Sequence, residues 1–129
     1  PKLSPLFNFI LISFKTSLVL AIKAFSISES FNWQQLASYD VDYFLLDAPG
    51  KTHRGGSGVT FNWELLNNCT IPKDKIILAG GLNVENVKTA ITITEPFAVD
   101  VSSGVEIDGI KNSKLIQQFI EAAKKELTL

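Results

Sequence analysis

Cysteine is nearly absent from this 129-residue chain. Cys69 is the only one, so no internal disulfide can form. A disulfide-stabilised secreted domain is excluded, and we expect a protein of a reducing, cytoplasmic setting. Histidine is equally scarce, because His53 is alone and has no cysteine or carboxylate at metal-ligand spacing. The sequence therefore predicts no metal site and no cofactor.

The chain also lacks an excess of either charge. Its 12 Lys and Arg residues face 13 Asp and Glu residues, for a formal net charge of −1, and no segment carries a basic stripe. Proteins that bind nucleic acid need such a stripe to neutralise phosphates. We therefore expect no nucleic-acid partner.

No uninterrupted apolar run is long enough to cross a membrane. The most apolar stretch, residues 6–25, is broken by polar residues and lysines into pieces shorter than the roughly 20 residues of a spanning helix. Residues 21–24, Ala-Ile-Lys-Ala, also make a poor signal-peptide cleavage site. We predict no membrane association, and instead a buried strand preceded by the tail of an amphipathic helix.

Size and composition predict one globular unit. A chain with 46% hydrophobic and 19% charged residues can bury one core but is too short for two ordinary domains. Because the sequence begins with Pro1 and not with Met, we expect a piece of a longer protein. Residues 1–129 are thus predicted to form a single partial domain.

Strand-like and helix-like segments alternate along the sequence. Short apolar runs predict strands at residues 18–25, 43–46, 76–79 and 97–101. A helical pattern follows each run, and Asn32, Asn62 and Asn83 are the expected caps of the first three. The last helix is expected from about Ser113. Four such units predict an α/β fold with a parallel sheet, either a small open sheet or half of an eight-stranded barrel.

Residues 75–106 have the features of a phosphate-binding cup. Gly80 and Gly81 lack a Cβ and can adopt positive φ, and the first amides of the helix that follows them favour an anion. Small residues after the next strand offer two hydroxyls and an unhindered amide. They are Ser102, Ser103 and Gly104. A second interpretation, that both segments are only tight turns between a strand and a helix, stays open.

Four motifs occur in order along the chain. They are Phe-Leu-Leu-Asp at 44–47, Gly-Gly-Ser-Gly at 55–58 with Phe-Asn-Trp at 61–63, Leu-Ala-Gly-Gly-Leu at 78–82 with Glu-Asn-Val at 85–87, and Val-Asp-Val-Ser-Ser-Gly-Val-Glu at 99–106. Together they resemble the phosphoribosylanthranilate isomerase family of tryptophan biosynthesis. The resemblance covers residues 18–123, leaves 1–17 as a poorly matched lead-in, and corresponds to strands five to eight of that family's (β/α)8 TIM barrel.

The resemblance implies an Amadori rearrangement. The substrate is a phosphorylated small molecule, N-(5-phosphoribosyl)anthranilate, and the product is 1-(2-carboxyphenylamino)-1-deoxyribulose 5-phosphate. By the resemblance, Asp47 is the general acid on the sugar ring oxygen and Asp100 positions the substrate. An acid in this role must keep its proton near neutral pH, and an apolar strand end beside a phosphate disfavours its charge. The residues alone leave two alternatives open: Asp47 as a cap of the next loop, and Asp100 as a buried carboxylate bonded to backbone.

The loop before the second Phe-Asn-Trp motif is rich in glycine. Gly56, Ser57 and Gly58 are candidates to close over the phosphate. A loop that is merely flexible is the alternative. His53 and Arg54 in the same loop are expected to be solvated.

The general base of the family has no counterpart in this chain. The resemblance places that base, a cysteine, at the end of strand one, which is absent, and Cys69 precedes the strand at 76–79 at the opposite edge of the sheet. We expect the chain alone to be inactive and to need the missing N-terminal half-barrel or self-association, because four parallel strands leave two open edges. The alternatives are an inactive phosphate-binding half-barrel, or another phosphate-binding barrel enzyme such as a ribulose-phosphate epimerase or an indole-glycerol-phosphate synthase.

Overall fold

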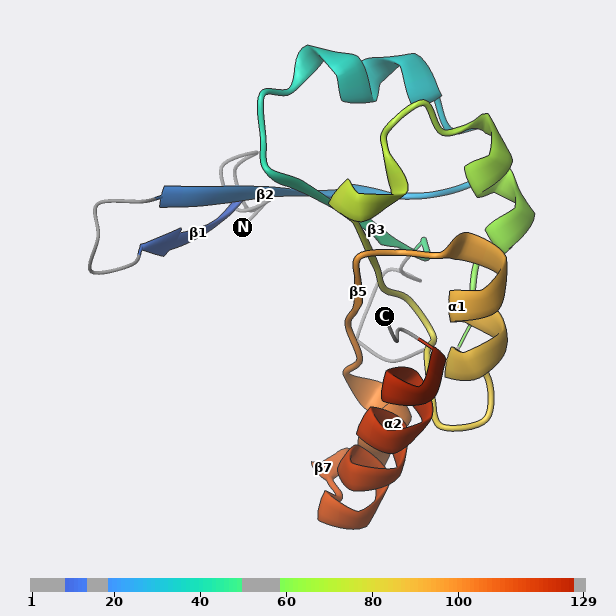
Figure 1. The fold of residues 1–129 in the computed structure, drawn as a ribbon. Helices are drawn as coiled ribbons and strands as arrows, with labels where there is room; N and C mark the ends of the chain where they lie inside the picture. Colours follow the sequence, from blue (N-terminus) through green and yellow to red (C-terminus); the bar gives the residue numbers. More distant parts are fainter. Residues whose placement is uncertain (1–8, 14–18, 50–58, 127–129) are drawn as a thin grey trace.

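A five-stranded sheet organises the protein, whose computed structural model describes residues 9–13, 19–49 and 59–126. The strand order is β1-β2-β3-β4-β5. The strands are β1 (Phe9–Ser13), β2 (Val19–Ser26), β3 (Tyr43–Asp47), β4 (Ile76–Leu78) and β5 (Ala98–Val99). Strands β2 to β5 are parallel, as predicted, and β1 runs antiparallel to β2. In Figure 1 the β1–β2 pair extends away from the rest of the molecule.

Helices follow the parallel strands. The longer ones are the 3-10 helices η2 (Trp33–Ser38) and η3 (Trp63–Asn68) and the α-helices α1 (Val87–Thr94) and α2 (Ser113–Glu126). Shorter elements are η4 (Lys73–Lys75), η5 (Ser103–Val105), β6 (Glu106–Ile107) and β7 (Ile110–Lys111). The structure thus confirms four strand–helix units and the start of the last helix at Ser113.

Two of the predicted helix caps are confirmed. Asn32 accepts a hydrogen bond from the amide of Gln34, and Asn62 accepts one from the amide of Glu64, both at 3.1 Å. The helices behind them are six residues long and of the 3-10 type. Helices of the 3-10 type are usually short, and these two are shorter than α1 and α2.

The two faces of the parallel sheet are covered unequally. On one face, Leu46 and Leu78 are neighbours in the register, and both are completely buried in one cluster with Leu36 of η2 and Ile91 of α1. Side chains alternate between faces along a strand, so the residues before these point the other way. That opposite row, which we call the open face, is only half-buried. It consists of Ala24, Leu45, Ile77 and Ala98.

The predicted helix tail ahead of β2 is wrong. Residues 9–13 form β1, which pairs with β2 from Phe9–Lys23 to Ser13–Val19. The sequence Phe-Ile-Leu-Ile-Ser is rich in residues that favour strands, and the edge of β2 offers unpaired backbone groups. In the described ranges the sheet keeps two open edges, as expected, but they are the outer edges of β1 and β5 because β1 covers that of β2.

The segment after β5 differs from the prediction as well. The strand predicted at 97–101 is reduced to Ala98–Val99, and a small hairpin, β6–β7, precedes α2. Asp108 and Gly109 join its strands with φ angles of 52° and 76°, the left-handed values of a two-residue hairpin turn.

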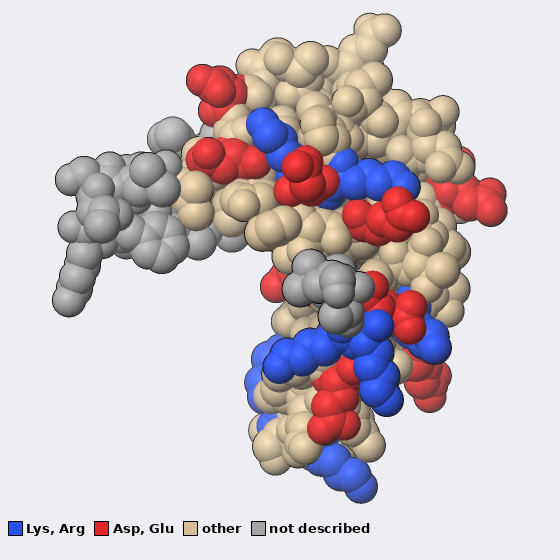
Figure 2. All heavy atoms as spheres, viewed as in Figure 1, with Lys and Arg blue, Asp and Glu red and all other residues tan. Residues whose placement is uncertain are grey.

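Charges of both signs are interspersed over the face drawn in Figure 2. The side chains of Lys lie beside those of Asp and Glu, notably on the part of the molecule that contains α2. Among the helices that the structure describes, none combines the length and the apolar character needed to cross a membrane.

Candidate active site

The carboxyl ends of β3, β4 and β5 lie at one edge of the sheet. Leu46 pairs with Leu78, and Leu78 pairs with Val99. The hydrogen bonds continue past the strand ends, because the amide of Ala79 donates to the carbonyl of Leu46 and that of Asp100 donates to the carbonyl of Leu78, both at 2.8 Å. The residues that follow, including Asp47, are therefore brought to the same edge.

The glycine turn after β4 lies directly against Asp47. Gly80 and Gly81 have φ angles of 90° and 66°, which confirms the expected left-handed backbone. A Cβ on Gly80 would lie 2.6 Å from Oδ1 of Asp47, and one on Gly81 would lie 2.6 Å from the carbonyl oxygen of Val59. Only glycine fits here, because the turn is pressed between the end of β3 and the chain at Val59.

The turn after β5 packs on the turn after β4. A Cβ on Gly104 would collide with the carbonyl oxygen of Leu82 and would lie 2.9 Å from the Cα of Asn83. Glycine at this position therefore allows the two backbones to touch. The two segments that were predicted to form one cup are adjacent in the structure.

The expected cap of the third helix, Asn83, acts one turn early. Helix α1 starts at Val87, and Asn86 precedes it without a capping side-chain bond. The Asn83 side chain accepts from the amides of Glu85 and Asn86 at 2.9 and 3.0 Å. The Asn86 side chain accepts from the amide of Asn83 at 2.8 Å and donates to the carbonyl of Gly81 at 3.0 Å. These interlocked asparagines hold the glycine turn and occupy several of the amides predicted to face an anion.

Other amides of the two turns remain available for a ligand. Among the described residues, no acceptor contacts the backbone N–H of five positions. They are Gly81, Leu82 and Val84 in the first turn and Ser103 and Gly104 in the second. Groups of unpaired amides in turns of this kind form concave sites for anions. These amides thus give the predicted cup a geometric basis. They lie in the two turns, however, whereas the prediction placed the anion at the first amides of the helix.

The Asp47 carboxyl has an environment suited to a proton donor. Its pKa is raised, mainly because the surrounding protein removes part of the water that would stabilise the charged form. The residue as a whole is still exposed. A hydrogen bond from the amide of Ala48 acts in the opposite direction, and the negative charge of Asp100 adds to the rise. A carboxyl that holds its proton more firmly than usual is a better general acid near neutral pH.

Asp100 lies beyond the end of β5 and is exposed. The alternative of a buried aspartate bonded to backbone is therefore wrong. Its charge acts on Asp47 across the strand ends. Strand β5 ends at Val99, and the chain enters η5 three residues after Asp100, at Ser103.

Lys111 is a functional candidate that the sequence did not reveal. Its Nζ donates to the carbonyl and hydroxyl oxygens of Ser102 at 2.7 and 3.2 Å and to Oε1 of Glu106 at 2.6 Å. The Asp-Gly pair at 108–109 was the available signal, since it marks a hairpin that folds Lys111 back beside Glu106.

Several other candidates lie elsewhere. Gly56, Ser57 and Gly58, with His53 and Arg54, fall outside the described residues. Cys69 follows η3 and precedes the amino end of β4, and burial raises the pKa of its thiol, which disfavours the reactive thiolate. Within the described ranges, no three His, Cys, Asp or Glu side chains are grouped so that they would hold a metal ion.

Comparison with known proteins gives one consistent result. The family model for N-(5'-phosphoribosyl)anthranilate isomerase matches residues 10–122. The isomerase of Listeria innocua is 50% identical over 103 residues, which are 80% of this chain and 51% of that protein. The chain thus spans about half the length of the curated relatives that it matches.

Solved structures agree with this result. The phosphoribosylanthranilate isomerase of Thermotoga maritima superposes with a TM-score of 0.66 and 42% identity, over 81% of this chain and 51% of that one. Another isomerase structure, bound to reduced 1-(o-carboxyphenylamino)-1-deoxyribulose 5-phosphate, gives a TM-score of 0.61 and 37% identity, over 81% and 48% of the two chains.

Proposed function

Because the chain belongs to the N-(5'-phosphoribosyl)anthranilate isomerase family, we propose that it supplies the acid and the phosphate cup of such an isomerase. The family has a TIM-barrel type of fold with a parallel sheet. In the proposal, β2, β3, β4 and β5 are strands five to eight of the barrel, and residues 1–129 are a single partial domain. The strand order and the half-length match to relatives support this assignment.

The proposed reaction is the Amadori rearrangement in tryptophan biosynthesis. The phosphate of N-(5'-phosphoribosyl)anthranilate binds to the unpaired amides around Gly81 and Gly104. Asp47 then donates its proton to the ring oxygen of the ribose, so that the C–O bond opens. Asp100 lies at the same edge and contacts the polar groups of the substrate. The observation that carries the proposal is the contact of Asp47 with Gly80, because it puts acid and cup side by side.

The second half of the reaction needs a base that removes the proton from C2 of the sugar. Cys69 is unsuited, because it lies toward the amino end of β4 and its thiol resists ionisation. We infer that an N-terminal half-barrel supplies the base, either within a longer form of this chain or as a separate polypeptide. Self-association is the alternative source of a second half.

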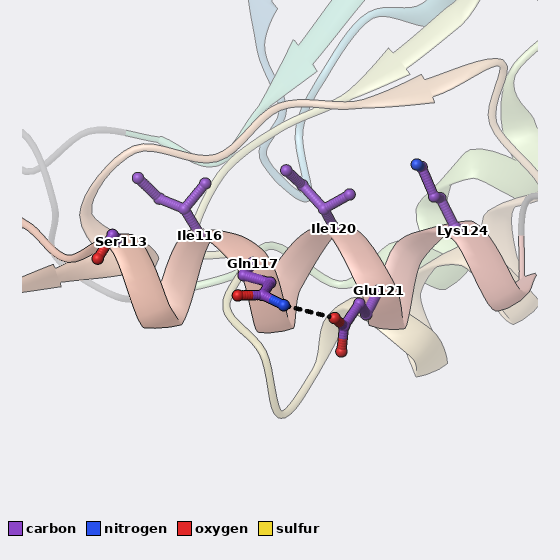
Figure 3. Close-up of a pocket in the computed structure, with 6 residues that line it drawn as sticks. All are labelled: Ser113, Ile116, Gln117, Ile120, Glu121 and Lys124. Carbon is purple, nitrogen blue, oxygen red and sulfur yellow. Dashed lines mark hydrogen bonds between the residues drawn. The ribbon is translucent and has the colours of Figure 1, made fainter.

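Three uncovered surfaces are where that half would dock. The first is the open face of the sheet, and the second is the unpaired edge of β5. The third is a shallow hollow along α2, where Ile116 and Ile120 point to the same side (Figure 3) and are 37% and 45% exposed. A barrel closes both its sheet and its ring of helices, so completing it would cover all three.

The test is reconstitution. The purified chain is mixed with the first half of the Listeria innocua relative, and consumption of N-(5'-phosphoribosyl)anthranilate is followed. We expect no turnover from the chain alone and clear turnover from the mixture. Asp47→Asn should lower that turnover by about 100-fold or more, the usual contribution of a positioned acid. Asp74→Asn, in the exposed η4 turn, is the matched control and should have no effect.

The outcomes separate the alternatives. Turnover by the isolated chain would disprove the need for a second half. Full activity of Asp47→Asn in the mixture would remove the acid assignment. A mixture that assembles and binds phosphate without turnover would favour an inactive phosphate-binding half-barrel.

A further inference from the structure

Lys111 contacts the second turn of the cup from behind. The side chain comes from β7, and its Nζ lies 2.7 Å from the carbonyl oxygen of Ser102 and 3.2 Å from the hydroxyl oxygen of the same residue. Nothing in the proposed mechanism uses this amine. Its position therefore calls for a role of its own.

The peptide unit after Ser102 links Lys111 to the cup. In a trans peptide the C=O and the following N–H point in opposite directions across one rigid plane. The Ser102 carbonyl faces Lys111, so the N–H of Ser103 faces away from it. Among the described residues that N–H has no acceptor, and the neighbouring Gly104 is pressed on Leu82 of the first turn.

We propose that Lys111 is a positioning residue for the phosphate cup, which it serves by fixing the peptide plane between Ser102 and Ser103. The proposal rests on the cup of the proposed function and adds the group that orients it. A charged amine also polarises the peptide, which strengthens the N–H on the far side as a donor. Lys111 acts through the backbone and has no contact with the substrate.

Glu106 contacts the same amine. Its Oε1 lies 2.6 Å from Nζ of Lys111, and the Glu106 side chain is 23% exposed whereas that of Lys111 is 50% exposed. The ion pair alone would make Lys111 a simple hairpin contact, since Glu106 and Lys111 are paired across β6 and β7. The two roles predict different results when each partner is removed.

The experiment is a titration of the full 129-residue chain with inorganic phosphate, followed through the backbone amide signals of Gly81, Ser103 and Gly104 by NMR. Lys111→Met keeps the aliphatic stem and removes the amine. We expect phosphate to bind about tenfold more weakly, because a charge-assisted hydrogen bond that orients a donor is lost. The Ser103 amide signal of the phosphate-free protein should also move.

Three variants serve as controls. Glu106→Gln removes the ion pair but leaves the bonds to Ser102, so affinity should stay within about twofold. Lys111→Arg retains a donor and should recover most of the affinity. Lys114→Met removes an exposed lysine of α2 and should change nothing. If Lys111→Met does not fold, the proposal still requires unchanged affinity in Glu106→Gln and near-normal affinity in Lys111→Arg.

The result that would overturn the proposal is phosphate binding that is equal in wild type and Lys111→Met, or weakened as much by Glu106→Gln as by Lys111→Met. In both cases the cup itself, and with it the proposed function, would stand. Absence of phosphate binding to the wild-type chain would instead remove the cup, and the role of Lys111 would fall with it.

Discussion

The two faces of one sheet differ although the same strands build both. Leu46 and Leu45 are successive residues of β3, yet Leu46 is 0% exposed under the helices whereas Leu45 lies half-buried on the open face. The covered face belongs to a finished core with Leu78 and Ile91. Parallel sheets are ordinarily covered on both faces. We therefore propose that this chain contributes one layer of a larger structure, whose other layer covers the open face.

The covered face should give the largest effect. Leu46→Ala removes a fully buried side chain from the core cluster and leaves a cavity, so we expect a loss of about 4 kcal/mol in the free energy of unfolding. Urea unfolding of the isolated chain, followed by circular dichroism, measures it. A loss below about 1 kcal/mol would mean that the covered face is not a packed core.

The adjacent residue sharpens the comparison. Leu45→Ala removes the same atoms from the open face, and we expect a loss of only about 1 kcal/mol in the isolated chain, because most of that surface is not yet packed. Once the other half-barrel is bound, the same substitution should weaken the complex by a further 2 kcal/mol or so. Equal losses from Leu45→Ala and Leu46→Ala in the isolated chain would contradict the difference between the faces.

The smallest effect concerns Asp47, which lies on the side of the open face at the end of β3. Its pKa is raised in the folded state, mainly by burial, so the ionised carboxylate costs stability at any pH above that pKa. Asp47→Asn removes the cost and should stabilise the chain at pH 7 by about 0.5 kcal/mol or less, since the group is accessible and screened.

The pH dependence gives the check on Asp47. As the pH falls through the raised pKa and below the ordinary aspartate value of about 3.9, wild type becomes protonated and the difference between the two proteins should vanish. Urea unfolding of both proteins between pH 3 and pH 7 measures this. A variant that is less stable than wild type at pH 7 would show that the carboxylate makes a net favourable contact instead.

Local chemistry explains which parts of the fold were predictable. Asn32 and Asn62 each bond an amide two residues away, so the signal and the structure lie within one short segment. The glycine turn was predictable for the same reason, because the positive φ angles at Gly80 and Gly81 are a local property that glycine adopts easily. Features of this kind depend little on the rest of the molecule.

Features that depend on distant segments were missed. Residues 9–13 become a strand because the edge of β2 is available, and no local pattern states that. Lys111 reaches Ser102 only after the Asp108–Gly109 turn reverses the chain. The predicted cap at Asn83 was partly confirmed. The Asn83 side chain accepts from the amide of Asn86, as a cap would, but the Asn86 side chain accepts from the amide of Asn83 in return, and α1 starts only after Asn86. The roles of Asp47, Asp100 and the cup in catalysis stay predictions.

The antiparallel β1 has a kinetic consequence for assembly. The edge of β2 that β1 covers is where strand four of a closed barrel would have to pair in the parallel direction. In the proposed assembly, a second half-barrel would first have to displace five paired residues of the same chain, so assembly would be a strand exchange whose rate depends on how often β1 detaches. Until then β1 would compete with other chains for the edge of β2, and the open edge on this side of the sheet would be that of β1.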